Sequence, residues 1–311
     1  MADNRKSVLI TGCSPGGIGH SLAREFHRNG LRVLATARDK SSLISLKEQG
    51  IETLSLVVDK EESRKACRDE VELLLKGKGL DYLVNNAWAC IVEHILTLDE
   101  LGYTVPVLDV NLQKAREVFE TNFISVIAMC QEFAPLIIKA KGTIVQIGSV
   151  AGIIPYVFGG VYNASKAALH SLSDSLRVEL APFGVQVTTI ITGGVKSNIA
   201  RTAHTLPETS LYQPVKAEYA RRIGHSQEGA LSNEAYARTV VTQILYGSAP
   251  LRWIRWLLLW PFGGRGIRRS GKYVWAGNRS TLLWFLNCGW TWFGLIQWWM
   301  ARTFNLWKLK K

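Results

Sequence analysis

Three side chains are spaced along the chain in a way that suits acid–base chemistry. Tyr162 and Lys166 are four residues apart, so on a helix they share one face. Ser149 lies thirteen residues before Tyr162 and follows the apolar run 142–147. A free phenol has a pKa of about 10, and a nearby ammonium lowers it by stabilising the phenolate. The three side chains therefore indicate proton exchange with an oxygen atom that Ser149 positions.

A glycine-rich turn follows the first apolar run. Residues 11–19 read Thr-Gly-Cys-Ser-Pro-Gly-Gly-Ile-Gly and separate the run 7–10 from a helical pattern over 18–29. Without Cβ atoms, backbone N–H groups can approach a pyrophosphate at the positive end of the helix. A tight strand–helix turn with no ligand is the alternative. The regular alternation of strands and helices that follows favours dinucleotide binding.

The end of the second predicted strand indicates which dinucleotide is bound. An acidic residue there would bond the adenosine ribose hydroxyls and repel a 2′-phosphate. The strand 31–36 has a neutral tip, and Arg38 follows, which can form charge-assisted bonds to a phosphate. Asp39 is the counter-argument, although pairing with Lys40 would also explain it. We favour NADPH.

Apolar runs and helical patterns alternate along most of the chain. The predicted strands are 7–10, 31–36, 51–58, 81–85, 142–147 and 185–191, and the predicted helices are 18–29, 41–49, 61–76, 111–140, 162–181 and 234–246. This alternation predicts an α/β fold, a doubly wound parallel sheet of the Rossmann type. We expect helix 111–140 to be interrupted near Pro135. We expect residues 192–233 to form a long irregular loop over the substrate site.

Over about residues 5–250 the sequence resembles the classical short-chain dehydrogenase/reductase family. The glycine turn matches TGxxxGxG with one extra glycine, and residues 85–88, Asn-Asn-Ala-Trp, match its NNAG. The family's catalytic residues fall on Asn122, Ser149, Tyr162 and Lys166. The cofactor contacts that the resemblance implies are Ile10, Gly12, Ser14, Gly17, Ile18, Gly19, Arg38, Asp59, Asn86, Tyr162, Lys166, Val195 and Ser197.

Within that family the sequence is most similar to membrane-bound, NADPH-dependent 1-acyldihydroxyacetone-phosphate reductases. The similarity lies in the form of the glycine turn, in Ala-Thr-Ala-Arg at 35–38, in residues 206–212 and in the Lys-Leu-Lys-Lys end. The resemblance implies hydride transfer from NADPH to a carbonyl carbon and a proton from Tyr162. Lys166 would lower the Tyr162 pKa and hold the nicotinamide ribose. Ser149 would orient the carbonyl, and Asn122 would hold a relay water.

Three departures from the family pattern predict an altered site. Trp88 replaces the glycine of NNAG, where the backbone normally lies close to the cofactor. Asp59 lies two places beyond the position where the family often has an aspartate near the adenine. Thr192 replaces the proline of Pro-Gly, whereas Ser197 keeps a hydroxyl near the nicotinamide amide. None of these changes affects the proton-transfer group.

The positive charge is concentrated at the C-terminal end of the chain. The net charge is +12, but residues 251–311 hold eleven of the 37 basic residues and no acidic one. The same segment holds ten of the eleven tryptophans, and 281–300 is uncharged. A basic, tryptophan-rich segment indicates a membrane surface rather than nucleic acid. We favour an in-plane or hairpin anchor over a single span, and cover for the substrate site or a dimer interface is the alternative.

The sequence thus predicts a catalytic domain, 1–250, and a membrane-associating tail, 251–311. The expected activity is NADPH-dependent reduction of a lipophilic ketone in lipid or secondary-metabolite biosynthesis. The alternatives are oxidation of a lipid, sterol or polycyclic alcohol and a non-catalytic nucleotide-binding scaffold. We expect the catalytic domain to face the cytosol at the endoplasmic reticulum or a lipid droplet. No metal or nucleic acid is expected, and a homodimer is left open.

Overall fold

The computed structural model describes residues 4–87, 104–196, 205–225, 227–247 and 273–278, with four single residues near the C-terminus. The strands are β1 (Ser7–Ile10), β2 (Arg32–Ala37), β3 (Glu52–Ser55), β4 (Tyr82–Asn85), β5 (Thr143–Ile147), β6 (Gln186–Thr192) and β7 (Tyr273–Ala276). The α-helices are α1 (Ile18–Arg28), α2 (Ile44–Lys47), α3 (Glu61–Leu75), α4 (Leu112–Phe119), α5 (Ser125–Ala140), α6 (Gly160–Leu180), α7 (Lys216–His225) and α8 (Asn233–Tyr246). The short turns include η1 (Lys40–Leu43), η3 (Glu120–Ile124, a π-helical turn), η4 (Val150–Gly152) and η7 (Gln213–Val215).

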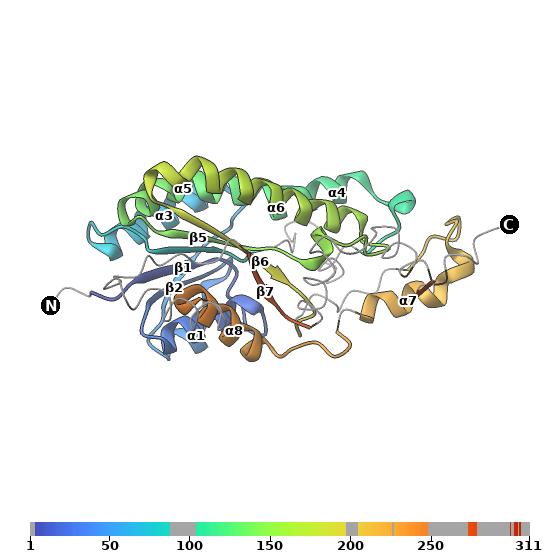
Figure 1. Ribbon diagram of the computed structural model, residues 1–311, viewed down its shortest axis with the longest axis horizontal. Helices are drawn as coiled ribbons and strands as arrows, with labels where there is room; N and C mark the ends of the chain where they lie inside the picture. The colour runs from blue at the N-terminus through green and yellow to red at the C-terminus, as the bar shows by residue number, and fades with distance from the viewer. Residues whose placement is uncertain are drawn as a thin grey trace, which may run out of the picture.

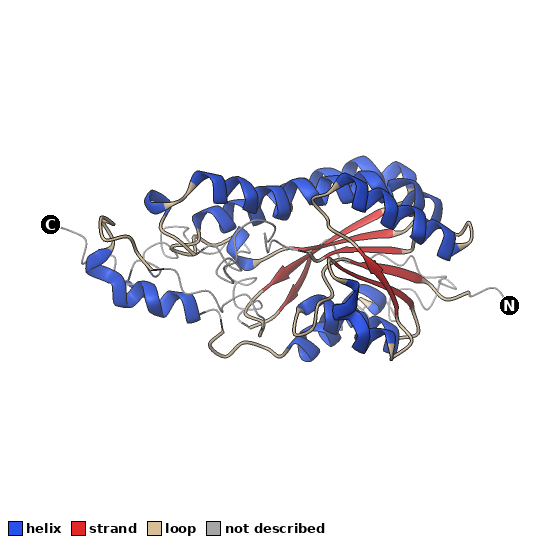
Figure 2. Ribbon diagram, turned by 180° about the vertical axis from the view of Figure 1, so that it is seen from behind, coloured by secondary structure: helices blue, strands red, loops and turns tan. Residues whose placement is uncertain are grey.

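The strands form one seven-stranded sheet in the order β3-β2-β1-β4-β5-β6-β7. Every neighbouring pair is parallel. Helices α1 and α8 cover one face, and α3, α4, α5 and α6 cover the other (Figures 1 and 2). The strand order reverses between β1 and β4, which is where sheets of this topology open a crevice at the carboxyl ends of the strands. The predicted doubly wound α/β fold is confirmed.

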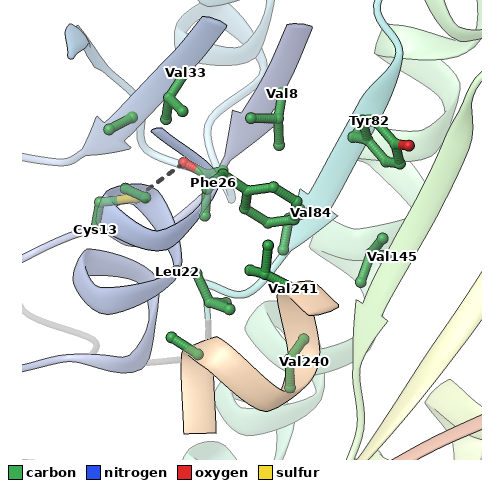
Figure 3. Close-up of a cluster of buried hydrophobic side chains, with 14 of the residues drawn as sticks. Val8, Cys13, Leu22, Phe26, Val33, Tyr82, Val84, Val145, Val240 and Val241 are labelled. Carbon is green, nitrogen blue, oxygen red and sulfur yellow. Dashed lines mark hydrogen bonds between the residues drawn. The ribbon is translucent and has the colours of Figure 1, made fainter. Parts of the chain in front are cut away.

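Each face of the sheet has its own hydrophobic core. Below the sheet, Leu22 and Phe26 of α1 meet Val240 and Val241 of α8 over side chains of β1, β2 and β4 (Figure 3). Above it, residues of α3, α5 and α6 pack on the opposite side of the same strands, with Phe133 fully buried. The central strands are buried on both faces, which explains why they read as continuous apolar runs in the sequence.

The interruption expected in the long helix lies elsewhere. Helix α5 continues through Pro135 to Ala140, so the expectation of a break there was wrong. The irregular part is η3, where the helix widens by one π-helical turn around Asn122. Taken together, residues 112–140 are long and apolar enough to cross a membrane by composition. Here this stretch packs against α3, β4 and β5, and its apolar side chains form part of the upper core.

Two ordered elements lie where the sequence predicted none. Helix α7 lies within 192–233, the stretch expected to be an irregular loop. Strand β7 lies within the segment assigned to the tail, and it pairs with β6 from Thr189↔Tyr273 to Thr192↔Ala276. The Tyr273 hydroxyl donates to both carboxylate oxygens of Asp174 on α6, at 2.7 and 2.6 Å. The sheet therefore extends beyond residue 250, into the sequence that follows α8.

Candidate functional site

Most of the candidate site residues lie at one edge of the sheet. Because the strands are parallel, their carboxyl ends meet there. The glycine turn follows β1, Arg38 follows β2, Asn86 follows β4, Ser149 lies two residues after β5, and Val195 follows β6. Residues far apart in the sequence are thereby brought to the point where the strand order reverses.

The glycine turn is packed so closely that side chains would not fit. Gly12 has φ +73°, and a Cβ there would lie 3.0 Å from the Cα of Ala87. A Cβ on Gly19 would lie 2.3 Å from the Gly12 carbonyl oxygen and 2.5 Å from Nδ2 of Asn86. That Nδ2 donates to the carbonyls of Thr11 (2.8 Å) and Gly12 (3.0 Å). Asn86, predicted to contact the cofactor, therefore also ties the turn to the end of β4.

The turn leaves the N-terminus of α1 available to a ligand. Gly17 is the N-cap residue, and no side chain caps the helix. Ser14 is exposed, and Ile18 is half-buried against the lower core. The side chain of Ile10 is fully buried, so only its backbone can contact a ligand. An uncapped helix N-terminus behind a turn without side chains fits a dinucleotide pyrophosphate.

The residues that decide between NADP and NAD lie beyond β2 and β3. Arg38 is exposed directly after β2. Asp39 caps η1, because its carboxylate accepts from the backbone N–H and the hydroxyl of Ser41 at 2.8 and 2.6 Å. These bonds hold the Asp39 pKa below its usual value. Asp39 was also expected to pair with Lys40, but Lys40 forms its ion pair with Glu70 instead. Asp59 is exposed in the turn between β3 and α3.

The nicotinamide end of the predicted site is described in part. Val195 is buried and forms a bridge with Leu231, whose carbonyl accepts from the N–H of Lys196 at 2.8 Å. Trp88 and Ser197, which the sequence analysis singled out, lie outside the described residues.

The proposed proton-transfer residues lie together beside β5. The Ser149 hydroxyl lies close enough to the Tyr162 phenol to act on its pKa. Lys166 is 6% exposed, and its Nζ lies 5.9 Å from the centre of the Tyr162 ring. The same Nζ donates to the carbonyl of Ile147, the last residue of β5, at 3.0 Å. The phenol, the hydroxyl and the ammonium therefore come together at the carboxyl end of one strand.

Burial changes the protonation of this group in a way that the sequence does not indicate. Desolvation raises the Tyr162 pKa, although the Ser149 hydroxyl and the positive charge of Arg222 both act to lower it. Desolvation also lowers the Lys166 pKa to about 8. The expectation that Lys166 lowers the Tyr162 pKa is therefore not met in this structure. Its ammonium is bonded to the Ile147 carbonyl, and the buried phenol is neutral at pH 7.

Asn122 approaches the same region from η3. Its Nδ2 donates to the hydroxyl of Ser165 at 3.1 Å, and that hydroxyl donates to the carbonyl of Tyr162 at 2.8 Å. The π-helical turn brings Asn122 to Ser165 on α6, and Ser165 lies between Tyr162 and Lys166 in the sequence. Such turns are often found at functional sites because they redirect one side chain out of the regular helical register.

The sequence did not indicate that His170 contacts the backbone of Ser149. Its Nε2 accepts the backbone N–H of Ser149 at 3.2 Å, so it fixes the turn that carries the serine. Burial, and secondarily the charge of Lys166, lowers the His170 pKa to about 4, which keeps the ring neutral and able to accept. A Cβ on Gly148 would lie 2.4 Å from this nitrogen. The available signal was spacing, because Tyr162, Lys166 and His170 recur every four residues on one helical face.

Arg222 was also missed, because it lies on the unpredicted α7. It is 6% exposed and close enough to Tyr162 for its charge to affect the Tyr162 pKa. The stretch has a helical signal, since Val215, Tyr219 and Arg222 follow one another at helical spacing and all three are buried. Pro207 and Pro214 precede the helix and give the stretch the character of a loop.

Comparison with known proteins places this arrangement in a family. The model of the short chain dehydrogenase family matches residues 6–206. The short-chain dehydrogenase srdE of Neurospora crassa is 36% identical over 310 residues, covering 98% of this chain and 94% of that protein. An NADPH-dependent 1-acyldihydroxyacetone phosphate reductase of Schizosaccharomyces pombe is 43% identical over 285 residues, covering 89% and 87%.

A solved structure supports the same fold. A short-chain dehydrogenase from Streptomyces avermitilis superimposes with a TM-score of 0.70 at 20% identity, over 99% of this chain and 98% of that chain. The family model covers well over half of the sequence, including the glycine turn and all four candidate catalytic residues. The chain belongs to the short-chain dehydrogenase/reductase family and is an oxidoreductase of that family.

Proposed function

We propose that this protein reduces the ketone of a lipophilic substrate with NADPH. The observation that carries the proposal is the proximity of Ser149 to the Tyr162 phenol, with Lys166 buried one turn beyond Tyr162 on α6. A carbonyl oxygen placed between these hydroxyls would receive two hydrogen bonds. As the carbonyl is reduced, charge builds on that oxygen, and donors already in place stabilise it.

The residues at the strand ends have separate tasks in this reaction. The glycine turn and the N-terminus of α1 would hold the pyrophosphate, and Val195 and Lys166 would border the nicotinamide and its ribose. When bound, NADPH supplies the hydride. Tyr162 donates a proton to the developing alkoxide, and Ser149 orients the carbonyl. Asn122, bonded to Ser165, is placed to hold a water that reprotonates the phenol through Lys166.

Support for NADP over NAD comes from Arg38 and Asp39. Arg38 is exposed at the end of β2, where a 2′-phosphate would be bound. The Asp39 carboxylate is engaged by Ser41, so its oxygens are already hydrogen-bonded. The fission yeast relative carries NADPH in its name.

Protonation favours reduction over the reverse reaction. Oxidation of an alcohol needs a phenolate as base, whereas reduction needs a phenol as acid. The raised Tyr162 pKa keeps the phenol protonated at neutral pH. Oxidation remains the second candidate. A non-catalytic scaffold would not need Ser149, Tyr162 and Lys166 to lie together as they do.

A lipophilic substrate and membrane association are supported by the sequence. Residues 281–300 carry no charge and five tryptophans, and basic residues flank them on both sides. Such a segment suits the boundary between lipid and water. A membrane-bound enzyme with its catalytic domain in the cytosol would meet ketones that partition into the bilayer.

Turnover of a ketone panel tests this function. Purified protein is given NADPH or NADH with ketones ranging from acylated dihydroxyacetone phosphates to sterols and polycyclic metabolites. We expect consumption of NADPH matched mole for mole by an alcohol product, and much weaker consumption of NADH. Failure to reduce any ketone, together with oxidation of the matching alcohols by NADP⁺, would favour the second candidate.

A further inference from the structure

One buried positive charge, that of Arg222, has no acidic partner among the residues that the structure describes. Arg222 on α7 is 6% exposed, and α7 lies beyond the carboxyl ends of the strands (Figure 1). Its guanidinium carbon stacks 3.3 Å above the centre of the Tyr156 ring, and its Nε donates to the carbonyl of Val157 at 3.0 Å. Tyr156 is itself held by His225, whose Nδ1 lies 2.5 Å from the phenol oxygen.

The groups that act on the Arg222 pKa besides burial are tyrosine side chains. Tyr156, Tyr162 and Tyr219 favour its charged form, and burial outweighs them and lowers its pKa. The nearest acidic residue along α7, Glu218, accepts from Asn305 at 3.0 Å and is not among these influences. Burying a cation without an anion is costly, so buried cations are usually paired with an anionic group.

The terminal nitrogens of Arg222 lie beside the start of the catalytic helix. A Cβ on Gly159, the N-cap residue of α6, would lie 3.5 Å from Nη2 of Arg222 and 3.1 Å from Oδ1 of Asn163. That Oδ1 is buried and accepts no hydrogen bond among the described residues. Asn163 follows Tyr162 directly, so an unsatisfied acceptor and the terminal nitrogens of Arg222 lie next to the proton donor.

We propose that Arg222 binds an anionic group, a phosphate or a carboxylate, on the ketone substrate. The inference rests on the proposed reductase function and names the class of ketone. The planar guanidinium can give two parallel hydrogen bonds to such a group, and stacking on Tyr156 fixes its plane. An anion held there would lie close to Tyr162 and would supply the counter-charge that the fold leaves out.

The test uses pairs of ketones that differ only in charge. One pair is an acylated dihydroxyacetone phosphate and the same ester without its phosphate. The second pair is a long-chain oxo fatty acid and its methyl ester, so the two pairs separate a phosphate from a carboxylate. For each pair, the ratio of kcat/KM for the charged to the neutral ketone is measured with NADPH.

Three variants make the test specific. We expect Arg222→Gln to reduce the charged-to-neutral ratio by about 10- to 100-fold, mainly through KM, since a bond to a charged group is lost. Arg222→Lys keeps the charge but loses the paired geometry, and should restore part of the ratio. The control is Arg221→Gln, which removes the same charge from the neighbouring exposed position and should leave the ratio unchanged. Thermal unfolding checks that each variant is folded.

The outcomes separate this inference from the proposed function. A wild-type enzyme that reduces both members of each pair equally well would overturn the inference and leave the reductase function standing. An equal loss for charged and neutral ketones in Arg222→Gln, with a shifted pH profile, would assign Arg222 to support of Tyr162 instead. Absence of NADPH-dependent reduction with every ketone would defeat the proposed function itself.

Discussion

At the scale of single residues, burial determines the chemistry that Tyr162 and Lys166 can perform. Both side chains were chosen from their spacing, and the structure places them together. Spacing alone suggested that the ammonium would acidify the phenol. Desolvation has the larger effect here, because it keeps Tyr162 protonated and moves the Lys166 pKa down to about 8. The pair is therefore set for proton donation at neutral pH.

The Lys166 pKa predicts how the rate of ketone reduction depends on pH. In the proposed mechanism the ammonium passes a proton to Tyr162 and holds the cofactor ribose, and it is lost as pH rises through about 8. We expect kcat/KM for ketone reduction to be constant below that pH and to fall above it. Lys166→Arg keeps its charge, so its lower rate should show no such fall. Activity of the native enzyme that stays level to pH 10 would contradict this role of Lys166.

A second prediction at the scale of single residues concerns Arg38 and the preference for NADPH over NADH. Replacing Arg38 with Ala should weaken NADPH binding by about 10- to 100-fold and change NADH binding little, because only the 2′-phosphate is contacted. Fluorescence titration with both cofactors measures this. Lys40→Ala is the control, since Lys40 is a neighbouring exposed cation that pairs with Glu70. Equal weakening of both cofactors by the Arg38 change would remove the assignment.

The sequence indicated the candidate site residues but not the side chains that contact them. Ser149, Tyr162, Lys166 and Asn122 were chosen as candidates because motif and spacing are both local properties, and the structure brings them to one region. His170 was left aside, because its contact with the Ser149 backbone depends on how α6 packs on the end of β5. That packing is a tertiary property, and no local pattern encodes it.

At the scale of elements, the shape of the glycine turn depends directly on residue type. A methyl group on Gly19 would overlap the Gly12 carbonyl and the Asn86 side chain. We expect Gly19→Ala to move the turn off the N-terminus of α1, to weaken NADPH binding at least about 10-fold and to cost about 1–3 kcal/mol of stability.

Titration calorimetry and thermal unfolding check this prediction. The control is Gly224→Ala, because no atom lies within 4 Å of the added methyl group and its φ is not in the left-handed region. That variant should bind NADPH like the native protein. Normal NADPH affinity in Gly19→Ala would show that the turn does not hold the cofactor.

Most of the core elements could be predicted, and the exceptions have physical causes. The buried parallel strands gave clear apolar runs, so six of them were identified. Pro135 suggested a break, yet α5 continues through it and its apolar face packs on the sheet. Helix α7 is short and lies close to two prolines, and β7 gains its stability from pairing with β6 and from Asp174, which local sequence cannot indicate.

At the scale of the whole molecule, the C-terminal region contributes a strand to the sheet and, in our proposal, also binds the membrane. Strand β7 completes the sheet, whereas the uncharged, tryptophan-rich residues 281–300 suit a membrane surface. A truncation that tests the anchor must therefore keep residues 273–278. We predict that residues 1–278 stay folded and no longer sediment with phospholipid vesicles, whereas the full chain does. Thermal unfolding is the control, and vesicle binding by the folded truncation would place the anchor elsewhere.

The central claim is that the Tyr162 phenol gives a proton to a carbonyl reduced by NADPH. The most direct measurement compares the native enzyme with Tyr162→Phe in a single turnover, after titration shows that both bind NADPH equally. General acid catalysis is worth about 10²- to 10⁴-fold, so we predict a loss of that size in the rate of NADPH oxidation. Oxidation at an unchanged rate, with NADPH affinity also unchanged, would contradict the account.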